Sequence, residues 1–580
     1  IIERIQHMFM RVAVTIHLDD IPSVLSTYTL LSSRQIAQDP LMSLYAGTTT
    51  QSRTTAYTTS FFNLDLEKLY GAVADCAFAI RNGGRVAISA QNVLCGGRKV
   101  PLNIGLWALL KLLDSAISLA RRTTDTRQDV ANLVIQPWHL DIRSALEYHT
   151  MHQHDLCDQK CISLTLSVPD IFMSRVESDG DWSLFCPRQV PDLLTTKGQF
   201  FERTYIAYEA SHVPRVKIRA REIWSIILRA ITVTGGPSII FKDSVDGKTN
   251  VPDLPPGSQH GDLRSGVIDS LGTGLELSPC NHVAISLPLL ITRERTFDFD
   301  KLYQLTKNVV VILNKVHDST VASMTEKADL IKDYHPIAIG VQGLADVFTA
   351  LRMPYDSPAA GALNIRIAET MYFAALDASC DLAEKHGPYP AYSRSPLARG
   401  IMQFDMWHQN PSSTHLDWTE LRARIQTFGV RNSLLIAIRP QDVCSAFSNC
   451  THPLYRDHWQ STRLTGDSNM HDQVVSPWLV QELIALRLWS DSMRERIISA
   501  GGSVQDIEGI PTDVKRIYRT AWEIDPECTI RMAIQRAPYV CHTDSISLHL
   551  ESPTPNLVGE LLMSSWASGL KTGLHKLHAR

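Results

Sequence analysis

Apolar side chains recur every three to four residues in several long stretches of the chain. This spacing predicts helices over residues 20–36, 64–81, 103–121 and 361–386, because positions three and four apart share one helix face. The last of these helices is ended by the pair Gly387-Pro388. Within residues 64–81 the recurring apolar positions are Leu66, Leu69, Val73, Cys76 and Phe78.

Short apolar runs rich in Val, Ile and Leu alternate with these helical stretches. Strands buried on both faces have this composition, and they occur mainly in parallel sheets covered by helices. The alternation predicts an α/β fold, and we expect residues 1–580 to form one body. The predicted strands are residues 85–89, 132–135, 163–168, 238–241, 283–287, 337–340 and 433–437.

The helical region over residues 64–121 has too much apolar surface for a helix with one buried face. The helix at 103–121 carries Trp107, Leu110 and Leu119 on more than one side, so it needs cover on several sides. Two arrangements provide that cover. The helices at 64–81 and 103–121 form a homodimer interface, or both are buried within one chain.

Composition narrows the class of protein. The chain has 580 residues, 44% of them hydrophobic and 20% charged, which is typical of a folded globular protein. A formal net charge of −4 gives no general attraction to nucleic acid or to anionic lipid. The apolar run at residues 106–113 is interrupted by Lys111 and is far shorter than a bilayer span. We therefore expect neither nucleic acid nor a membrane as a partner.

The eleven cysteines follow no regular spacing, which favours free thiols over a disulfide framework. One cluster offers nitrogen and sulfur ligands of the kind that zinc accepts. It lacks the close Cys or His pairs of most zinc sites, so a polar surface loop is the favoured interpretation, and no metal or other cofactor is expected. The cluster consists of His149, His152, His154, Cys157 and Cys161.

Six longer strings, spread in order along the whole chain, resemble the large subunit of class I ribonucleotide reductase. The resemblance implies that family's fold, a ten-stranded α/β barrel with helical flanking regions. The family's ATP-binding cone would precede Ile1, so we expect neither this cone nor a viral N-terminal extension within residues 1–580. The strings are Met10-Arg-Val-Ala-Val14, Pro137-Trp-His-Leu-Asp-Ile142, Asp181-Trp-Ser-Leu-Phe-Cys-Pro187, Gly340-Val-Gln-Gly-Leu-Ala-Asp346, Arg431-Asn-Ser-Leu-Leu-Ile-Ala437 and Gly569-Leu-Lys-Thr-Gly573.

The same resemblance allows the catalytic positions to be counted. The family uses an Asn-x-Cys-x-Glu loop in which cysteine holds a thiyl radical and glutamate takes a proton. Counting back from Ser278-Pro-Cys-Asn-His282 places Leu263, Ser265 and Val267 at these positions. A valine accepts no proton, and a serine oxygen holds a radical far less readily than sulfur does.

Other positions of the family pattern also differ. Cys280 matches one cysteine of the reducing pair, but its partner position is Ser60, so Cys280 is interpreted as a small buried residue. The two tyrosines of the radical relay fall on His575 and Lys576, and lysine is not readily oxidised. The phosphate loop becomes residues 440–444, where Asp442 would repel a phosphate.

These differences predict no catalytic residues and a protein that is not an enzyme. The pattern resembles the inactive large-subunit homologue of betaherpesviruses, the cytomegalovirus-like group. That resemblance implies a viral scaffold, in host cytoplasm or virion tegument, that modulates cell death and innate immune signalling through partners such as receptor-interacting kinases. The alternative is a divergent reductase large chain that retains nucleotide binding or activity with a small subunit.

Overall fold

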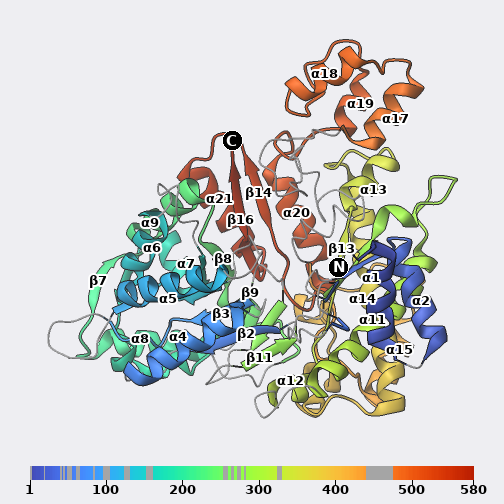
Figure 1. Cartoon of the computed structure of the whole chain (residues 1–580). Helices are drawn as coiled ribbons and strands as arrows, with labels where there is room; N and C mark the ends of the chain where they lie inside the picture. The colour runs from blue at the N-terminus through green and yellow to red at the C-terminus, as the bar shows by residue number, and fades with distance from the viewer. Residues whose placement is uncertain are drawn as a thin grey trace.

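A computed structural model describes most of the chain (Figure 1). The described residues are 3–18, 20–38, 42–43, 46–48, 55–60, 66–81, 85–95, 105–122, 131–151, 161–251, 259–262, 267–270, 276–279, 282–322, 329–413, 415–438 and 475–580.

A seven-stranded sheet forms one half of the α/β fold. Its strands lie in the order β11-β2-β3-β4-β5-β8-β15, with β2, β3, β4, β5 and β8 parallel and the two outer strands antiparallel to their neighbours. The bounds are β2 Thr55–Ser60, β3 Arg85–Ser89, β4 Ala131–Ile135, β5 Ile162–Val168, β8 Ser238–Phe241, β11 Glu276–Pro279 and β15 Thr572–Leu574.

Helices connect the parallel strands and cover them, as such connections require. Helix α4 (Leu66–Arg81) leads from β2 to β3, and α5 (Gly105–Arg122) leads from β3 to β4. Figure 1 shows these helices beside α6, α7 and α9 on the same side of the molecule. The later helices are α6 Ile142–Met151, α7 Asp170–Glu177, α8 Gly198–Ala210, α9 Ala220–Thr234, α10 Lys242–Gly247 and α21 Pro555–Ala567.

A second sheet lies in the other half of the molecule. Strand β12 (His282–Ser286) pairs in parallel with β13 (Ala338–Gln342) and antiparallel with β1 (Ile36–Gln38). Helix α11 (Phe299–Ala322) connects β12 to the short α12 (Asp329–Tyr334), which precedes β13, and α11 packs on α14 (Pro358–His386). Helix α14 is buried along most of its length because it lies inside the second hydrophobic cluster.

The remaining elements extend these two halves. Helices α17, α18 and α19 form a third hydrophobic cluster, and they lie together at the top of Figure 1. Their bounds and those of the other elements are α1 Ile5–His17, α2 Ile21–Ser32, β6 Asp181–Leu184, β7 Val216–Arg219, β9 Gln259–Asp262, β10 Val267–Ser270, α13 Leu344–Ala350, α15 Trp418–Phe428, α17 Pro477–Ala485, α18 Asp491–Ser499, α19 Thr512–Ile517, α20 Pro526–Arg536, β14 Ser547–Leu550 and β16 Lys576–Ala579.

Three expectations from the sequence are wrong in detail. The helix predicted over residues 20–36 ends at Ser32, and Ile36 begins β1. Phe78 is 65% exposed, because it follows buried Cys76 by two residues and so lies on the other side of the helix. Residues 433–437 form no strand, although Ile436 bridges Ile339 and the backbone of Leu434, Leu435 and Ala437 hydrogen-bonds to residues 337 and 339. The backbone N–H groups of Leu435 and Ile436 both point at the Cys541 sulfur, at 2.9 and 3.1 Å, so a regular ladder is interrupted.

We predict that Trp182→Ala lowers the free energy of unfolding by about 3–5 kcal/mol. Trp182 is fully buried, stacks on Tyr205 with a centroid distance of 4.5 Å, and donates its indole N–H to the Pro137 carbonyl at 3.1 Å. Denaturant unfolding measures the effect. Phe200→Ala is the matched control, since Phe200 is 71% exposed on α8 and its loss should change stability by less than about 0.5 kcal/mol. Equal losses in both variants would contradict this assignment of the core.

Candidate functional site

Buried polar side chains gather beyond the carboxyl ends of β3 and β4, the edge at which open α/β sheets bind their ligands. Gln136 donates to the Gln91 side chain at 2.9 Å and accepts from the Trp138 indole at 2.6 Å. The ring of His139, which is fully buried, contacts the Val93 carbonyl at 2.9 Å. These contacts hold the loops after the two strands together.

Two thiols lie at the same edge. Cys95 follows β3, Cys186 follows β6, and the two side chains hydrogen-bond to each other. The hydrogen bond from Cys95 lowers the pKa of Cys186 to about 6, although burial opposes this shift. Cys186 is partly exposed, and its lowered pKa makes it the more nucleophilic of the two thiols.

The carboxyl-terminal strands bring a lysine into the interior next to β8. Lys571 is buried, and its Nζ donates to the carbonyls of Val540, Cys541 and His542 at 3.3, 2.8 and 3.1 Å. Burial lowers the pKa of Lys571 to about 7. The amine therefore fixes the 540–542 segment while remaining able to lose its proton near neutral pH.

The two predicted relay positions are adjacent, with His575 between β15 and β16 and Lys576 as the first residue of β16. His575 is half-buried, its backbone N–H donates to the Ile546 carbonyl at 2.6 Å, and its carbonyl accepts from the Ser238 hydroxyl at 2.6 Å. Lys576 begins β16, and its side chain is exposed. The two neighbouring side chains thus face different surroundings.

The other counted positions are located only in part. Ser60 ends β2 and pairs in register with Ser89 of β3. Val267 begins β10, which pairs antiparallel with β9 so that Val267 lies opposite Asp262. Leu263, Ser265, Cys280 and residues 440–444 lie outside the described residues.

The predicted zinc cluster is described only at its two ends, and these have separate partners. The His149 ring contacts the Thr234 hydroxyl at 3.1 Å, whereas the Cys161 sulfur accepts from Arg121 at 3.6 Å. His152, His154 and Cys157 lie outside the described residues.

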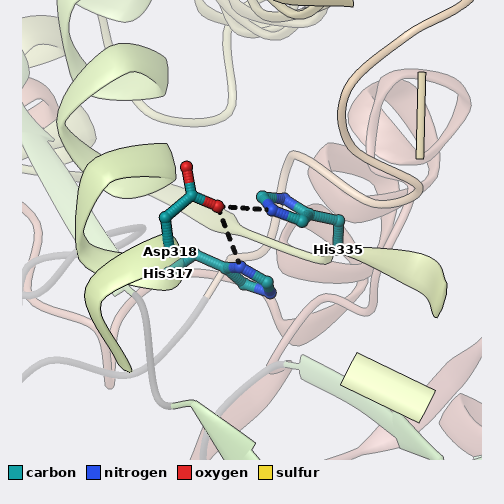
Figure 2. Close-up of side chains that lie close together, drawn as sticks. All are labelled: His317, Asp318 and His335. Atoms are coloured by element: carbon teal, nitrogen blue, oxygen red, sulfur yellow. Dashed lines mark hydrogen bonds and ion pairs between the residues drawn. The ribbon is translucent and has the colours of Figure 1, made fainter. Parts of the chain in front are cut away.

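A different trio, which the sequence analysis missed, brings three metal-ligand types together (Figure 2). The ligand atoms of His317, Asp318 and His335 all lie within 4.8 Å of one another. His335 Nε2 lies 2.9 Å from Asp318 Oδ1, and His317 Nδ1 lies 3.9 Å from the same oxygen. Burial lowers the pKa of His317 to about 4, so this imidazole is neutral at pH 7. No local spacing rule connects residue 335 with 317 and 318, so the sequence pattern gave no signal.

These features define a large α/β protein with helix-connected parallel strands and a polar, thiol-bearing edge. Its fold is similar to that of the Actinobacillus ureae class Id ribonucleotide reductase alpha subunit, with a TM-score of 0.72, 15% identity, and coverage of 100% of this chain and 95% of that one. The barrel domain of ribonucleotide reductase, as a sequence family, matches residues 62–575.

Curated relatives agree with this match over the whole chain. The Neurospora crassa ribonucleoside-diphosphate reductase large chain is 35% identical over all of this chain and 62% of its own length. The large subunits of Danio rerio and Monkeypox virus are 33% and 34% identical over all of this chain and 73% and 75% of their own lengths. The chain belongs to the ribonucleotide reductase large-subunit family.

The prediction that the protein is not an enzyme is contradicted by these relatives. They match the entire chain at about one-third identity, and their names are those of an enzyme, ribonucleoside-diphosphate reductase. The prediction depended on counted positions that lie largely outside the described residues.

Among the described helices, none is long and apolar enough to cross a membrane.

We predict that Lys571 makes stability rise with pH between about 7 and 10. Its folded-state pKa, about 7, lies below the ordinary lysine value, so in this window the unfolded chain binds one more proton than the folded chain. The expected slope is up to about 1.4 kcal/mol per pH unit. Unfolding measured at several pH values should show this slope in the wild type and lose it in Lys571→Met. Lys576→Met is the control, because Lys576 is exposed and its replacement should leave the slope unchanged. A slope that survives in Lys571→Met would refute the assignment of the pH dependence to Lys571.

Proposed function

We propose that this chain is a ribonucleoside-diphosphate reductase large chain that binds nucleotides and acts with a small subunit. The observation that carries the proposal is the full-chain match to relatives bearing this name, at 32–35% identity. The chain spans 62% of the Neurospora crassa relative and about three-quarters of the viral ones, so the activity of the whole protein is itself part of the proposal.

The described residues support nucleotide binding at the carboxyl edge of the parallel strands. The loops after β3 and β4 are fixed to each other through Gln91 and Gln136, which gives a ligand a preformed surface. Closure of the two sheets into a ten-stranded barrel is part of this proposal.

We predict that nucleotides stabilise the chain and that deoxynucleotides form when a relative's small subunit, a ribonucleoside diphosphate and dithiothreitol are added. A ligand at 100 times its dissociation constant stabilises the folded state by about 2.7 kcal/mol, which a thermal shift detects. Chromatography of the nucleotides measures turnover, and the mixture without small subunit is the control. Stabilisation without turnover would reduce the proposal to nucleotide binding. The absence of both stabilisation and turnover would refute the proposal.

The counted positions are tested in the same assay. The triple variant Leu263→Asn, Ser265→Cys, Val267→Glu restores the residue types that the family pattern requires. If positions 263, 265 and 267 are the catalytic ones, the triple variant forms deoxynucleotides faster than the wild type. Equal and measurable rates in the two proteins would show that the count identifies the wrong residues.

We also propose that the chain forms a homodimer through α4 and α5. Large apolar side chains on these two helices face outward, with Tyr70, Phe78 and Leu119 each more than half exposed. Exposed apolar groups on neighbouring helices are typical of subunit interfaces.

Leu119→Glu together with Phe78→Glu should convert a dimer into a monomer, because two charges would be buried at the interface. Light scattering after size-exclusion chromatography measures the mass. Val233→Glu is the matched control, since Val233 is 61% exposed on α9, outside the proposed interface. A double-glutamate variant that retains the dimer mass would place the interface elsewhere.

The finer predictions from the viral resemblance remain predictions. The large subunits of Monkeypox virus and Vaccinia virus, which are 34% and 33% identical to this chain, are poxvirus proteins and not betaherpesvirus proteins. A signalling scaffold, receptor-interacting kinases as partners, and a location in host cytoplasm or virion tegument have no support among the described residues. Co-purification of the chain with such kinases from transfected cells tests them.

A further inference from the structure

His317 carries a buried imidazole. Its side chain is 1% exposed, and neither Nδ1 nor Nε2 has a hydrogen-bond partner among the residues that the structure describes. Leaving a buried polar group unsatisfied costs about 1–3 kcal/mol, so such a group needs an explanation. Both nitrogens of a neutral imidazole carry either a proton or a lone pair, and a lone pair is what a metal ion accepts.

We propose that His317, Asp318 and His335 bind one divalent transition-metal ion, with Zn²⁺ as the preferred species. Two imidazoles and one carboxylate are a donor set that zinc accepts, with water in the fourth position. The Asp318 side chain is 57% exposed, so solvent reaches the site. Figure 2 shows the Asp318 carboxylate directed toward both rings. His317 lies on the same helix as Asp318, α11, and His335 lies between α12 and β13.

The distances fit a tetrahedral ion with little movement. Zinc–nitrogen and zinc–oxygen bonds of about 2.0–2.2 Å place neighbouring ligand atoms roughly 3.4 Å apart. The separations of Asp318 Oδ1 from His335 Nε2 and His317 Nδ1, 2.9 and 3.9 Å, lie on either side of this value. The two rings lie against each other at a centroid distance of 3.6 Å with a 33° tilt.

The second sphere holds His335 in place. Asn432 Nδ2 donates to the His335 carbonyl at 3.0 Å and to Asn314 Oδ1 at 3.1 Å, and it lies 3.3 Å from His335 Nδ1. Its two hydrogens can serve only two acceptors at once. Coordination through His335 Nε2 puts the ring proton on Nδ1, so Asn432 gives up the longest of these contacts and keeps the other two.

One positive charge competes for the carboxylate. Arg431 Nη2 lies 3.7 Å from Asp318 Oδ1, but Arg431 also reaches the Gly387 carbonyl at 3.5 Å and is partly exposed. The guanidinium can therefore withdraw when an ion binds. The ion would join the end of α11 to the segment before β13, at the amino end of that strand, so we assign it a structural role in this half of the molecule.

The experiment uses the full chain, freed of metal with a chelator and titrated with zinc chloride against a chromogenic chelator. We expect one Zn²⁺ to bind and to raise the melting temperature. In His317→Phe and in Asp318→Asn the affinity should fall by more than about 100-fold, because even second-sphere changes cost 10–100-fold. Asp318 is exposed, so Asp318→Asn should fold even if His317→Phe does not. This variant therefore keeps the test valid if His317→Phe fails to fold.

The control is His578→Phe. His578 stacks on His549 at 4.4 Å, and neither residue belongs to the ligand-type group found among the described residues. Zinc binding should be unchanged in this variant. Cobalt substitution distinguishes this site from one with cysteine ligands, because thiolate ligands add strong near-ultraviolet absorption that a His₂Asp site lacks. Absence of binding, or binding that persists in both site variants and disappears in Cys157→Ser, would overturn the proposal.

Discussion

The side chain of Asn432 holds together three elements of the second half of the molecule. Its amide contacts Asn314 of α11, Ser379 of α14 and the backbone of His335 ahead of β13, and all of these atoms are buried. A buried amide is tolerated only when its donors and acceptors are paired. The packing of α11 on α14 and the starting point of β13 therefore depend on one satisfied network, and the His317–Asp318–His335 group lies at its edge.

Much of the fold could be predicted because burial leaves a direct mark on sequence. Strands β3 and β8 coincide with the predicted residues 85–89 and 238–241, since parallel strands covered on both faces must be apolar throughout. The helix predicted at 361–386 is found at Pro358–His386. The segment 433–437 has the same composition but no regular ladder, because the contact that interrupts it comes from Cys541, more than a hundred residues away.

The candidate site was much less predictable. Motif strings located His575 and Lys576, but the different burial of their side chains depends on the pairing of β15 and β16. Clustering along the sequence singled out residues 149–161, whereas the structure brings His335 beside Asp318, which is 17 residues away in the sequence. The prediction of inactivity treated each substitution as a lost function, and the match to named reductases overturns that conclusion.

Cys541 has one further consequence. Its sulfur is fully buried and receives two backbone N–H groups, so a thiol reagent can reach it only after the 435–436 segment separates from it. The rate at which this cysteine becomes labelled therefore reports the opening of the molecule's interior. Cys541 is thus an intrinsic probe of local opening. It lies between the 435–436 segment of one half of the molecule and Lys571 of the other half.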